Sequence, residues 1–330
     1  MNNLLNKREN PFSVLTCPEI TSDCVAIIVT YNRKNLLIKS LKAHINQDIK
    51  CDIILIDNAS TDGSCEYVME QFYSQNKNIH YIRLGNNLGG AGGFHFGMKY
   101  ALANNWQWFW LMDDDAQPDK DALSNLRLNA NRFKNIYGSA AVGFGSKPMK
   151  LCWPAEILKS KHDIRTNFIG SYDQLKDVQE LSGIPFLGFF IHRDLVYKIG
   201  LPDPNFFIYS DDKEYCERAK KNSAKIILIK NSIIYHPMPL KGTTYKFLNN
   251  NIVYRSMPPW KLYYYVRNKI IVGKKYYGKR FITQTIPGII FRIIISMLKE
   301  QRRLSLLFAY IMAFVDGFAA RTPRRLLPPV

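Results

Sequence analysis

Short apolar runs alternate in the first part of the chain with segments whose apolar residues recur at helical spacing. The first run is continuous and rich in β-branched residues, which is typical of a strand buried on both faces, and the other runs repeat its apolar signal. The runs lie at residues 24–30, 53–56, 80–84 and 108–112. The helical segments between them lie at residues 35–46, 64–73 and 91–103. This alternation predicts an α/β fold, Rossmann-like, with a mostly parallel sheet flanked by helices.

Polar residues directly follow each predicted strand. They occupy positions 31–33, 57–63, 86–93 and 113–115. Ligands of open parallel sheets bind at the carboxyl ends of the strands. We therefore expect one edge of the sheet to collect these residues and to carry the functional site.

Three consecutive carboxylates, Asp113, Asp114 and Asp115, end the most aromatic of these runs. They would repel one another unless a cation neutralised them. Mg²⁺ and Mn²⁺ are usually held by one or two carboxylates and completed by substrate phosphates. Asp113 and Asp115 would share the metal, or reach the metal and a ribose respectively. The alternative is a solvated acidic turn before a helix that begins near Asp119.

Two of the other three strand ends have either a nucleotide-binding or a structural interpretation. Asp57 is the first residue beyond its run, where a carboxylate can accept the imide N–H of a uracil or thymine, although Asp, Asn and Ser also favour caps and turns. The glycines after Asn87 permit close backbone approach and lead into a helix whose N-terminus favours phosphate. A flexible turn is the alternative, because the spacing matches neither a Walker loop nor a dinucleotide fingerprint.

The net charge of +18 is concentrated towards one end of the chain. Residues 251–330 hold 15 Lys and Arg against two acidic residues, which leaves the first 250 residues mildly basic. Two apolar runs, 281–291 and 304–315, alternate there with basic pairs, as in helices that lie in an anionic bilayer interface. Both runs are too short to span a bilayer. A helical subdomain with solvated basic residues is the alternative. The basic pairs are Lys274–Lys275, Lys279–Arg280, Arg302–Arg303 and Arg324–Arg325.

Cysteine usage and the first residues predict a cytoplasmic protein. The six cysteines, Cys17 among them, form no CxxC pair and fit free thiols in a reducing compartment. The beginning of the sequence has no apolar stretch of the kind a secretory signal needs.

These motifs, in their order, resemble family 2 glycosyltransferases, and within them the galactofuranosyltransferase and rhamnosyltransferase-like branch. The resemblance covers roughly residues 25–268. Its parts are residues 30–33, 57–60, 87–94, 110–116 and 207–215, then His236 and residues 263–268. The glycine-rich element followed by the aspartate triplet is most similar to the galactofuranosyl branch.

The resemblance implies a GT-A fold and a role for each matching residue. The residues implied to contact the nucleotide sugar are Thr30, Tyr31, Asn32, Arg33, Asp57, Asn58, Asn87, Gly89, Gly90, Gly92, Asp113 and Asp114. Asp113, Asp115 and His236 would hold Mn²⁺ or Mg²⁺ on the diphosphate. Asp212 would be the catalytic base, flanked by Asp211 and Glu214, whose like charge can raise its pKa.

Two of these roles have plain structural alternatives. His236 precedes Pro237 after an apolar run, where an isolated histidine is more often a core or turn residue. Asp211, Asp212 and Glu214 also suit the exposed start of a helix, where the helix dipole favours acidic side chains.

The expected activity is inverting, metal-dependent transfer of galactofuranose from UDP-galactofuranose to a hydroxyl of a lipid-linked glycan such as O-antigen, capsule or cell-wall polysaccharide. Transfer of rhamnose from dTDP-rhamnose and a non-catalytic nucleotide-sugar-binding scaffold are the alternatives. Nucleic acid is not expected as a partner, because the strand-end aspartates would repel it. We expect addition of one or a few sugars, because an extended N-terminal domain is lacking.

The expected organisation has three parts. They are a polar leader at 1–22, a catalytic domain at 23–250 with a nucleotide-sugar half (23–135) and an acceptor half (136–250), and a basic amphipathic helical region at 251–330. That last region would hold the protein on the inner face of the cytoplasmic membrane.

Overall fold

The computed structural model describes residues 12–16, 18–76, 78–146, 149–157, 167–239, 242–247, 250–320 and 322–323. The predicted leader up to residue 11, Cys17, Arg324 and Arg325 lie outside the described residues. The chain divides into two compact units. The first runs to Pro204 and resumes at Tyr215–Met238, and the second comprises Asn205–Glu214 and the chain from Pro239 onward. The predicted division at residues 22, 135 and 250 stays a prediction.

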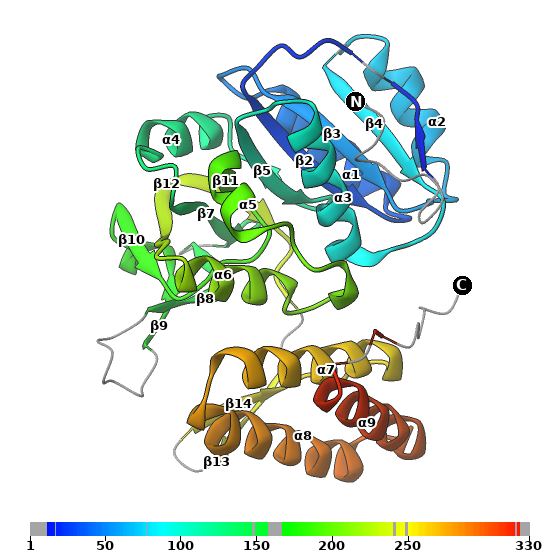
Figure 1. Ribbon diagram of the computed structural model, residues 1–330, viewed down its shortest axis with the longest axis vertical. Helices are drawn as coiled ribbons and strands as arrows, with labels where there is room; N and C mark the ends of the chain where they lie inside the picture. Colours follow the sequence, from blue (N-terminus) through cyan, green and yellow to red (C-terminus); the bar gives the residue numbers. More distant parts are fainter. Residues whose placement is uncertain are drawn as a thin grey trace. The chain divides into compact units, whose positions relative to one another are not determined.

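A mixed sheet forms the centre of the first unit (Figure 1). Its order is β1-β4-β3-β2-β5-β11-β7-β12-β10, with β6 beside β12, and with β8 and β9 extending from β7. β2, β3, β4 and β5 are mutually parallel, and β11 is the antiparallel strand between β5 and β7. The predicted mostly parallel α/β sheet is confirmed. The strands are β1 (Phe12–Val14), β2 (Cys24–Thr30), β3 (Asp52–Asp57), β4 (Ile79–Leu84), β5 (Trp108–Asp113), β6 (Gln117–Pro118), β7 (Ile136–Gly143), β8 (Lys150–Ile157), β9 (Asn167–Ser171), β10 (Val178–Leu181), β11 (Phe189–His192) and β12 (Ile226–His236).

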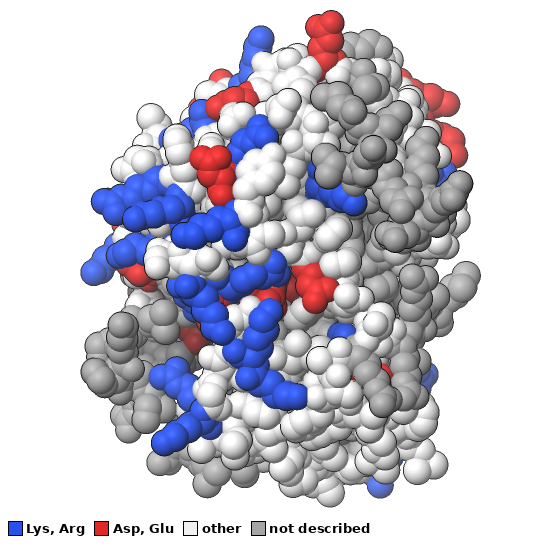
Figure 2. Space-filling view, viewed as in Figure 1, with Lys and Arg blue, Asp and Glu red and all other residues white. Residues whose placement is uncertain are grey.

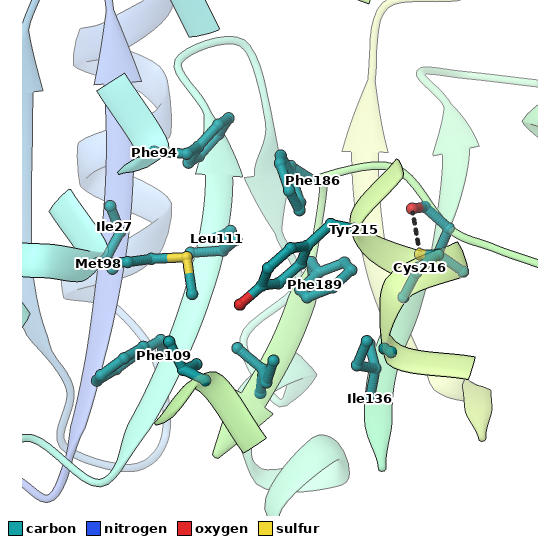
Figure 3. Packing of buried hydrophobic residues seen from close by; sticks show 14 of the residues in the cluster. Ile27, Phe94, Met98, Phe109, Leu111, Ile136, Phe186, Phe189, Tyr215 and Cys216 are labelled. Atoms are coloured by element: carbon teal, nitrogen blue, oxygen red, sulfur yellow. Dashed lines mark hydrogen bonds between the residues drawn. The ribbon is translucent and has the colours of Figure 1, made fainter. Parts of the chain in front are cut away.

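Alternate residues of the central strands supply two hydrophobic clusters, because successive side chains of a strand point to opposite faces. In one cluster Ile27 and Leu111 pack with Phe94 and Met98 of α3 (Figure 3). The other contains the intervening strand residues and apolar residues of α1, α2 and α4. The helices are α1 (Lys34–Ile45), α2 (Ser64–Val68), α3 (Gly89–Ala103), α4 (Ala122–Asn129), α5 (Arg193–Ile199) and α6 (Asp211–Lys221), with short turns η1 (Met69–Tyr73), η2 (Tyr172–Gln174) and η3 (Pro204–Phe206).

Three helix limits differ from those predicted. α3 begins two residues early, at Gly89, which adopts φ +71° and whose N–H donates to Asn87 Oδ1 at 2.8 Å. The segment predicted as one helix at 64–73 ends in the π-helical turn η1. The helix expected near Asp119 begins at Ala122, after β6 and a turn.

The second unit consists of a hairpin, helices and the segment that leads into α6. Its core contains Leu262, Tyr263 and Tyr264 of α7, Ile289 of α8 and Tyr310 of α9. The elements are β13 (Thr243–Phe247), β14 (Asn250–Tyr254), α7 (Pro259–Tyr276), η4 (Phe281–Thr285), α8 (Ile286–Lys299) and α9 (Arg303–Phe318).

The helical segment that contains the apolar run at 281–291 continues in the structure to Lys299. Arg292 interrupts the run in the sequence, but this side chain is buried and donates to the backbone oxygen of Arg255. Among the described residues, Phe281–Lys299 is 19 residues long with mean hydropathy 1.7, enough to cross a membrane by length and composition alone. The predicted end at residue 291 is therefore wrong.

Candidate functional site

The turns after β2 and β3 are bound to each other. Asn32 adopts the left-handed conformation (φ +51°), and its backbone N–H donates to Ser60 Oγ at 3.0 Å. Its side-chain Oδ1 accepts from the N–H of Thr61 at 2.7 Å. Asn32 is thus a connector between two strand ends. Tyr31 and Arg33, its neighbours in the sequence, are exposed and accessible to a ligand.

Asp57 lies inside the protein and not at the surface of this edge. It is fully buried, and its two oxygens accept from the Ser60 N–H (2.8 Å) and the Tyr81 hydroxyl (2.8 Å). A buried carboxylate with these partners holds the turn in place. The predicted contact with a nucleobase stays a prediction, and Asp57 could make it only if this turn opened.

Asn58 connects the second turn to the glycine-rich segment. Its Nδ2 donates to the Gly89 carbonyl at 3.3 Å, and its Oδ1 accepts from the Leu88 N–H at 3.1 Å. The side chain is 2% exposed. Three of the four predicted strand ends therefore form one hydrogen-bonded assembly, in which the side chains of Asn58 and Asn87 accept or donate hydrogen bonds.

The glycines of α3 have different roles. A Cβ on Gly93 would overlap Val29, and one on Gly92 would overlap Leu88, so these glycines permit close packing. A Cβ on Gly90 would meet open space. The expected approach of a phosphate to bare backbone is therefore limited to the start of the helix, at Gly89 and Gly90.

We expect Gly93→Ala to lower the free energy of unfolding by about 1–3 kcal/mol, because the added methyl overpacks α3 against β2. Gly90→Ala is the matched control in the same helix and should change stability by less than about 0.5 kcal/mol or raise it slightly. Urea unfolding followed by circular dichroism measures both. Equal midpoints for the two variants would contradict the packing role of Gly93.

The aspartate triplet lies at the end of β5 with its side chains directed to different partners. Asp114 is 4% exposed, and its oxygens accept from Thr30 Oγ1 (2.8 Å) and Arg33 Nη1 (3.2 Å). Arg33 Nη1 also lies 2.8 Å from Asp115 Oδ2. Thr30 and Arg33 thus position the triplet, and half of the Arg33 side chain (51%) remains exposed for an anionic ligand.

His236, from the end of β12, completes a compact group with two of these aspartates. Ligand atoms of Asp113, Asp115 and His236 all lie within 4.8 Å of one another. His236 Nε2 is 3.0 Å from Asp115 Oδ1, and Nδ1 lies 2.6 Å from the carbonyl of Pro237. The ring of Trp153 in β8 packs beside His236, with centroids 5.0 Å apart. The triplet and His236, more than a hundred residues apart in sequence, are brought together as predicted.

Burial and neighbouring charges shift the pKa values of these residues in different directions. Burial and the charges of the two neighbouring carboxylates raise the pKa of Asp113 to about 7, and burial raises that of Asp114 to about 6. Burial also opposes ionisation of Asp115 and His236, but their mutual contact outweighs it. The pKa of Asp115 is lowered and that of His236 is raised to about 10. Without a metal, His236 is therefore an imidazolium paired with Asp115.

The residues present fit a divalent cation. Asp115 Oδ1 is buried and lies 3.0 Å from His236 Nε2, and two carboxylates plus an imidazole suit Mn²⁺ or Mg²⁺. The Pro237 carbonyl can accept the Nδ1 proton of His236, which leaves Nε2 directed at Asp115 as the ligand atom. His236 would lose its Nε2 proton on binding a cation.

The segment that leads into α6, in the second unit, has an unusual backbone. Phe207, Tyr209 and Ser210 have φ values of +60°, +68° and +64°, which non-glycine residues rarely adopt. Such strain persists only where surrounding structure imposes it, and it gathers at functional sites. Asp211 and Asp212 follow directly, as the first residues of α6.

Asn268 in α7 holds this strained segment. Its side chain is fully buried, and Nδ2 lies within hydrogen-bond distance of the carbonyls of Phe206 (2.8 Å), Ile208 (3.0 Å) and Tyr209 (2.9 Å). The neighbouring Arg267 donates to the Asn205 carbonyl at 3.1 Å. The motif at 263–268 is part of the family resemblance, but the sequence alone indicates no role for it. The structure assigns Arg267 and Asn268 as positioning residues for the segment before Asp212.

Glu214 is held differently from Asp212. It is 2% exposed, and its Oε1 accepts from Lys275 Nζ (2.9 Å) and the Tyr276 hydroxyl (2.6 Å) of α7. Burial is the largest cause of the raised pKa of Asp212, rather than the like charge that we invoked. Lys275 and Tyr276 were missed by sequence reasoning, because nothing local pairs them with a carboxylate 61 residues away.

More than half of the chain matches a known protein family. Residues 25–200 match the sequence model of the family described as glycosyl transferase family 2. The galactofuranosyltransferase GlfT1 of Mycolicibacterium smegmatis is 32% identical over 64% of this chain and 70% of its own length. GlfT1 of Mycobacterium tuberculosis is 29% identical over 66% of this chain and 71% of its own.

Solved structures share the fold at low sequence identity. GalNAc-T7, crystallised with UDP, GalNAc and Mn²⁺, superposes with a TM-score of 0.56 at 16% identity, over 96% of this chain and 59% of that one. Residues 1–349 of Staphylococcus aureus TarS, in complex with UDP-GlcNAc, give 0.57 at 15% identity, over 91% and 82%. This chain thus spans less than two thirds of the GalNAc-T7 chain. The likeness establishes the GT-A fold that the sequence predicted.

Proposed function

Because this chain belongs to glycosyl transferase family 2, we propose that it transfers galactofuranose from UDP-galactofuranose to a hydroxyl of a lipid-linked surface glycan. The observation that carries the proposal is the group of Asp113, Asp115 and His236 at the carboxyl edge of the sheet. The donor sugar is inferred from a relative that is 32% identical to this chain and is a galactofuranosyltransferase. The uridine nucleotide also agrees with the UDP and UDP-GlcNAc complexes of structural neighbours.

Asp113, Asp115 and His236 would hold Mn²⁺ or Mg²⁺ together with the donor diphosphate. A divalent cation supplies charge neutralisation on the departing nucleoside diphosphate. Arg33 is anchored to Asp114 and Asp115 and half exposed, so its free donors can bind a phosphate. Tyr31 is the exposed aromatic side chain beside it and can stack on a base.

Asp212 is the proposed base for an inverting displacement. Its carboxylate accepts the proton of the acceptor hydroxyl while that oxygen forms a bond to the anomeric carbon. The bond from this carbon to the phosphate oxygen breaks, and UDP leaves. The strained turn before α6, held by Asn268, fixes the start of the helix that carries Asp212. We place Asp211 and Glu214 in supporting roles, Glu214 through its bonds to α7.

The proposal is tested by nucleoside-diphosphate release from purified full-length protein with Mn²⁺ and a lipid-linked acceptor, across UDP-galactofuranose, UDP-galactopyranose and dTDP-rhamnose. We expect release from UDP-galactofuranose only, with loss of activity in EDTA and recovery on adding Mn²⁺ or Mg²⁺. Turnover of dTDP-rhamnose alone would change the donor and keep the reaction class. Nucleotide binding without release from any donor would favour a non-catalytic scaffold.

A further inference from the structure

Helix α9 is apolar on both of its sides. Leu306, Ala309, Tyr310 and Ala313 form its buried side within the second unit. Its other side also carries large apolar residues, at the helical spacing of three and four. They are Leu304 (83% exposed), Phe308 (60%), Ile311 (52%), Val315 (45%) and Phe318 (45%). A helix that only packed on a soluble core would have polar residues there.

Helix α8, which contacts α9, repeats the pattern. Ile289 and Ile295 are buried, whereas Ile290 (48% exposed), Ile294 (50%) and Leu298 (65%) recur every fourth residue on the outside. Figure 2, drawn in the view of Figure 1, shows mainly uncharged surface over α8. We call the two outward stripes together, residues 290, 294, 298, 304, 308, 311, 315 and 318, the α8–α9 apolar face. Large exposed apolar surfaces of this kind mark a protein or membrane contact.

The charges around this face are of one sign. Lys279 and Arg280 are exposed before α8, and Lys299, Arg302 and Arg303 are exposed between α8 and α9. The acidic residues of positions 251–330 are Glu300 and Asp316. Asp316 is buried and accepts from the Tyr263 hydroxyl at 2.7 Å, and Glu300 accepts from that of Tyr254 at 2.8 Å. The face thus presents cations at its borders without matching exposed anions.

We propose that the α8–α9 apolar face docks on the surface of an anionic phospholipid bilayer, with its leucine, isoleucine and phenylalanine side chains in the acyl boundary and the basic residues among the lipid headgroups. Amphipathic surfaces of this composition bind membranes by apolar burial together with attraction to anionic lipid. A second copy of this chain is a poorer occupant, because a symmetric contact would bring like-charged borders together.

Hydrogen bonds and ring contacts between α8 and the rest of the second unit indicate that α8 lies on the membrane and does not span it. Ser296 of α8 lies within hydrogen-bond distance of the hydroxyls of Tyr310 (2.8 Å) and Tyr254 (3.2 Å). The Arg292 guanidinium is buried against the rings of Tyr254 and Tyr265. If α8 crossed a bilayer alone, these groups would lose their partners inside hydrocarbon, where each unsatisfied polar group costs several kcal/mol.

Vesicle co-sedimentation of the full-length protein tests the proposal without donor or acceptor. The docking extends the proposed function, on which it rests, by holding the protein at the membrane that carries a lipid-linked acceptor, yet this assay can fail or succeed independently of transfer. We expect binding to vesicles with about one-third phosphatidylglycerol, weaker binding to pure phosphatidylcholine, and partial release at about 0.5 M salt.

The double variant Leu304→Glu with Phe308→Glu should lower the partition coefficient at least about tenfold. Leu128→Glu, at an 81% exposed leucine of α4 in the first unit, is the matched control and should bind as the wild type does. Circular dichroism checks that the variants are folded. If the variant Leu304→Glu with Phe308→Glu is unfolded, the variant Ile290→Glu with Ile294→Glu on α8 is tested in its place.

Three results would overturn the proposal. They are equal vesicle binding by the wild type and the face variants, a wild-type dimer that the face variants convert to monomer in light scattering, and resistance of the membrane-bound protein to alkaline carbonate. The second result would assign the face to another copy of the chain, and the third would assign α8 as a spanning helix.

Discussion

Asp212→Asn is expected to lower kcat for sugar transfer by about 10³-fold while leaving donor binding nearly unchanged. The amide keeps the size of the carboxylate and cannot accept the proton of the acceptor hydroxyl. The raised pKa of Asp212, caused by its burial, also makes the carboxylate a better proton acceptor than an exposed aspartate. Initial rates of UDP release and calorimetric titration with UDP separate the two effects.

Glu217→Gln is the matched control for this substitution. Glu217 lies in the same helix and forms an ion pair with Lys220 at 3.0 Å, which is worth at most about 1 kcal/mol. Its loss should leave kcat within about twofold of the wild type. Full turnover by the Asp212→Asn protein would remove Asp212 as the base. A parallel loss of UDP binding would point to misfolding of the segment before α6 instead.

Asp115→Asn is expected to reduce metal-dependent transfer by at least about 10²-fold and to raise the Mn²⁺ concentration needed for half-maximal activity. The variant removes one of the two carboxylate ligands and the ion-pair partner of His236. Folding should survive, because the amide can still accept a hydrogen bond from Arg33, which is half exposed. Calorimetry with Mn²⁺ measures the affinity directly.

Asp121→Asn is the control for the second substitution, since Asp121 is an exposed aspartate six residues along the chain. It should leave both the Mn²⁺ affinity and the rate unchanged. If Asp115→Asn bound Mn²⁺ as tightly as the wild type, the group of Asp113, Asp115 and His236 would not be the metal site. His236→Ala should weaken Mn²⁺ binding as well, since it removes the nitrogen ligand of the same group.

The edge of the sheet that carries the candidate metal group could be predicted because its signals are local. Strand runs such as residues 24–30 and 108–112 are apolar throughout, and the parallel arrangement then places their carboxyl ends along one edge. For the glycine-rich segment, local sequence signals did not distinguish glycines that pack from glycines that face open space. Its composition suggested phosphate binding, yet Gly92 and Gly93 serve packing, because only the neighbouring side chains reveal which glycine faces open space.

Sequence by itself determined the α/β class, the order of the central elements, the aspartate triplet and the basic character of residues 251–330. These features follow from periodicity and composition, which can be recognised within a short stretch of neighbouring residues. Tertiary structure decided the burial of Asp57, the partners of Glu214, the strained turn held by Asn268 and the outward apolar face of α8 and α9. Each of these depends on contacts between residues far apart in the sequence, and local patterns do not encode which distant side chains meet.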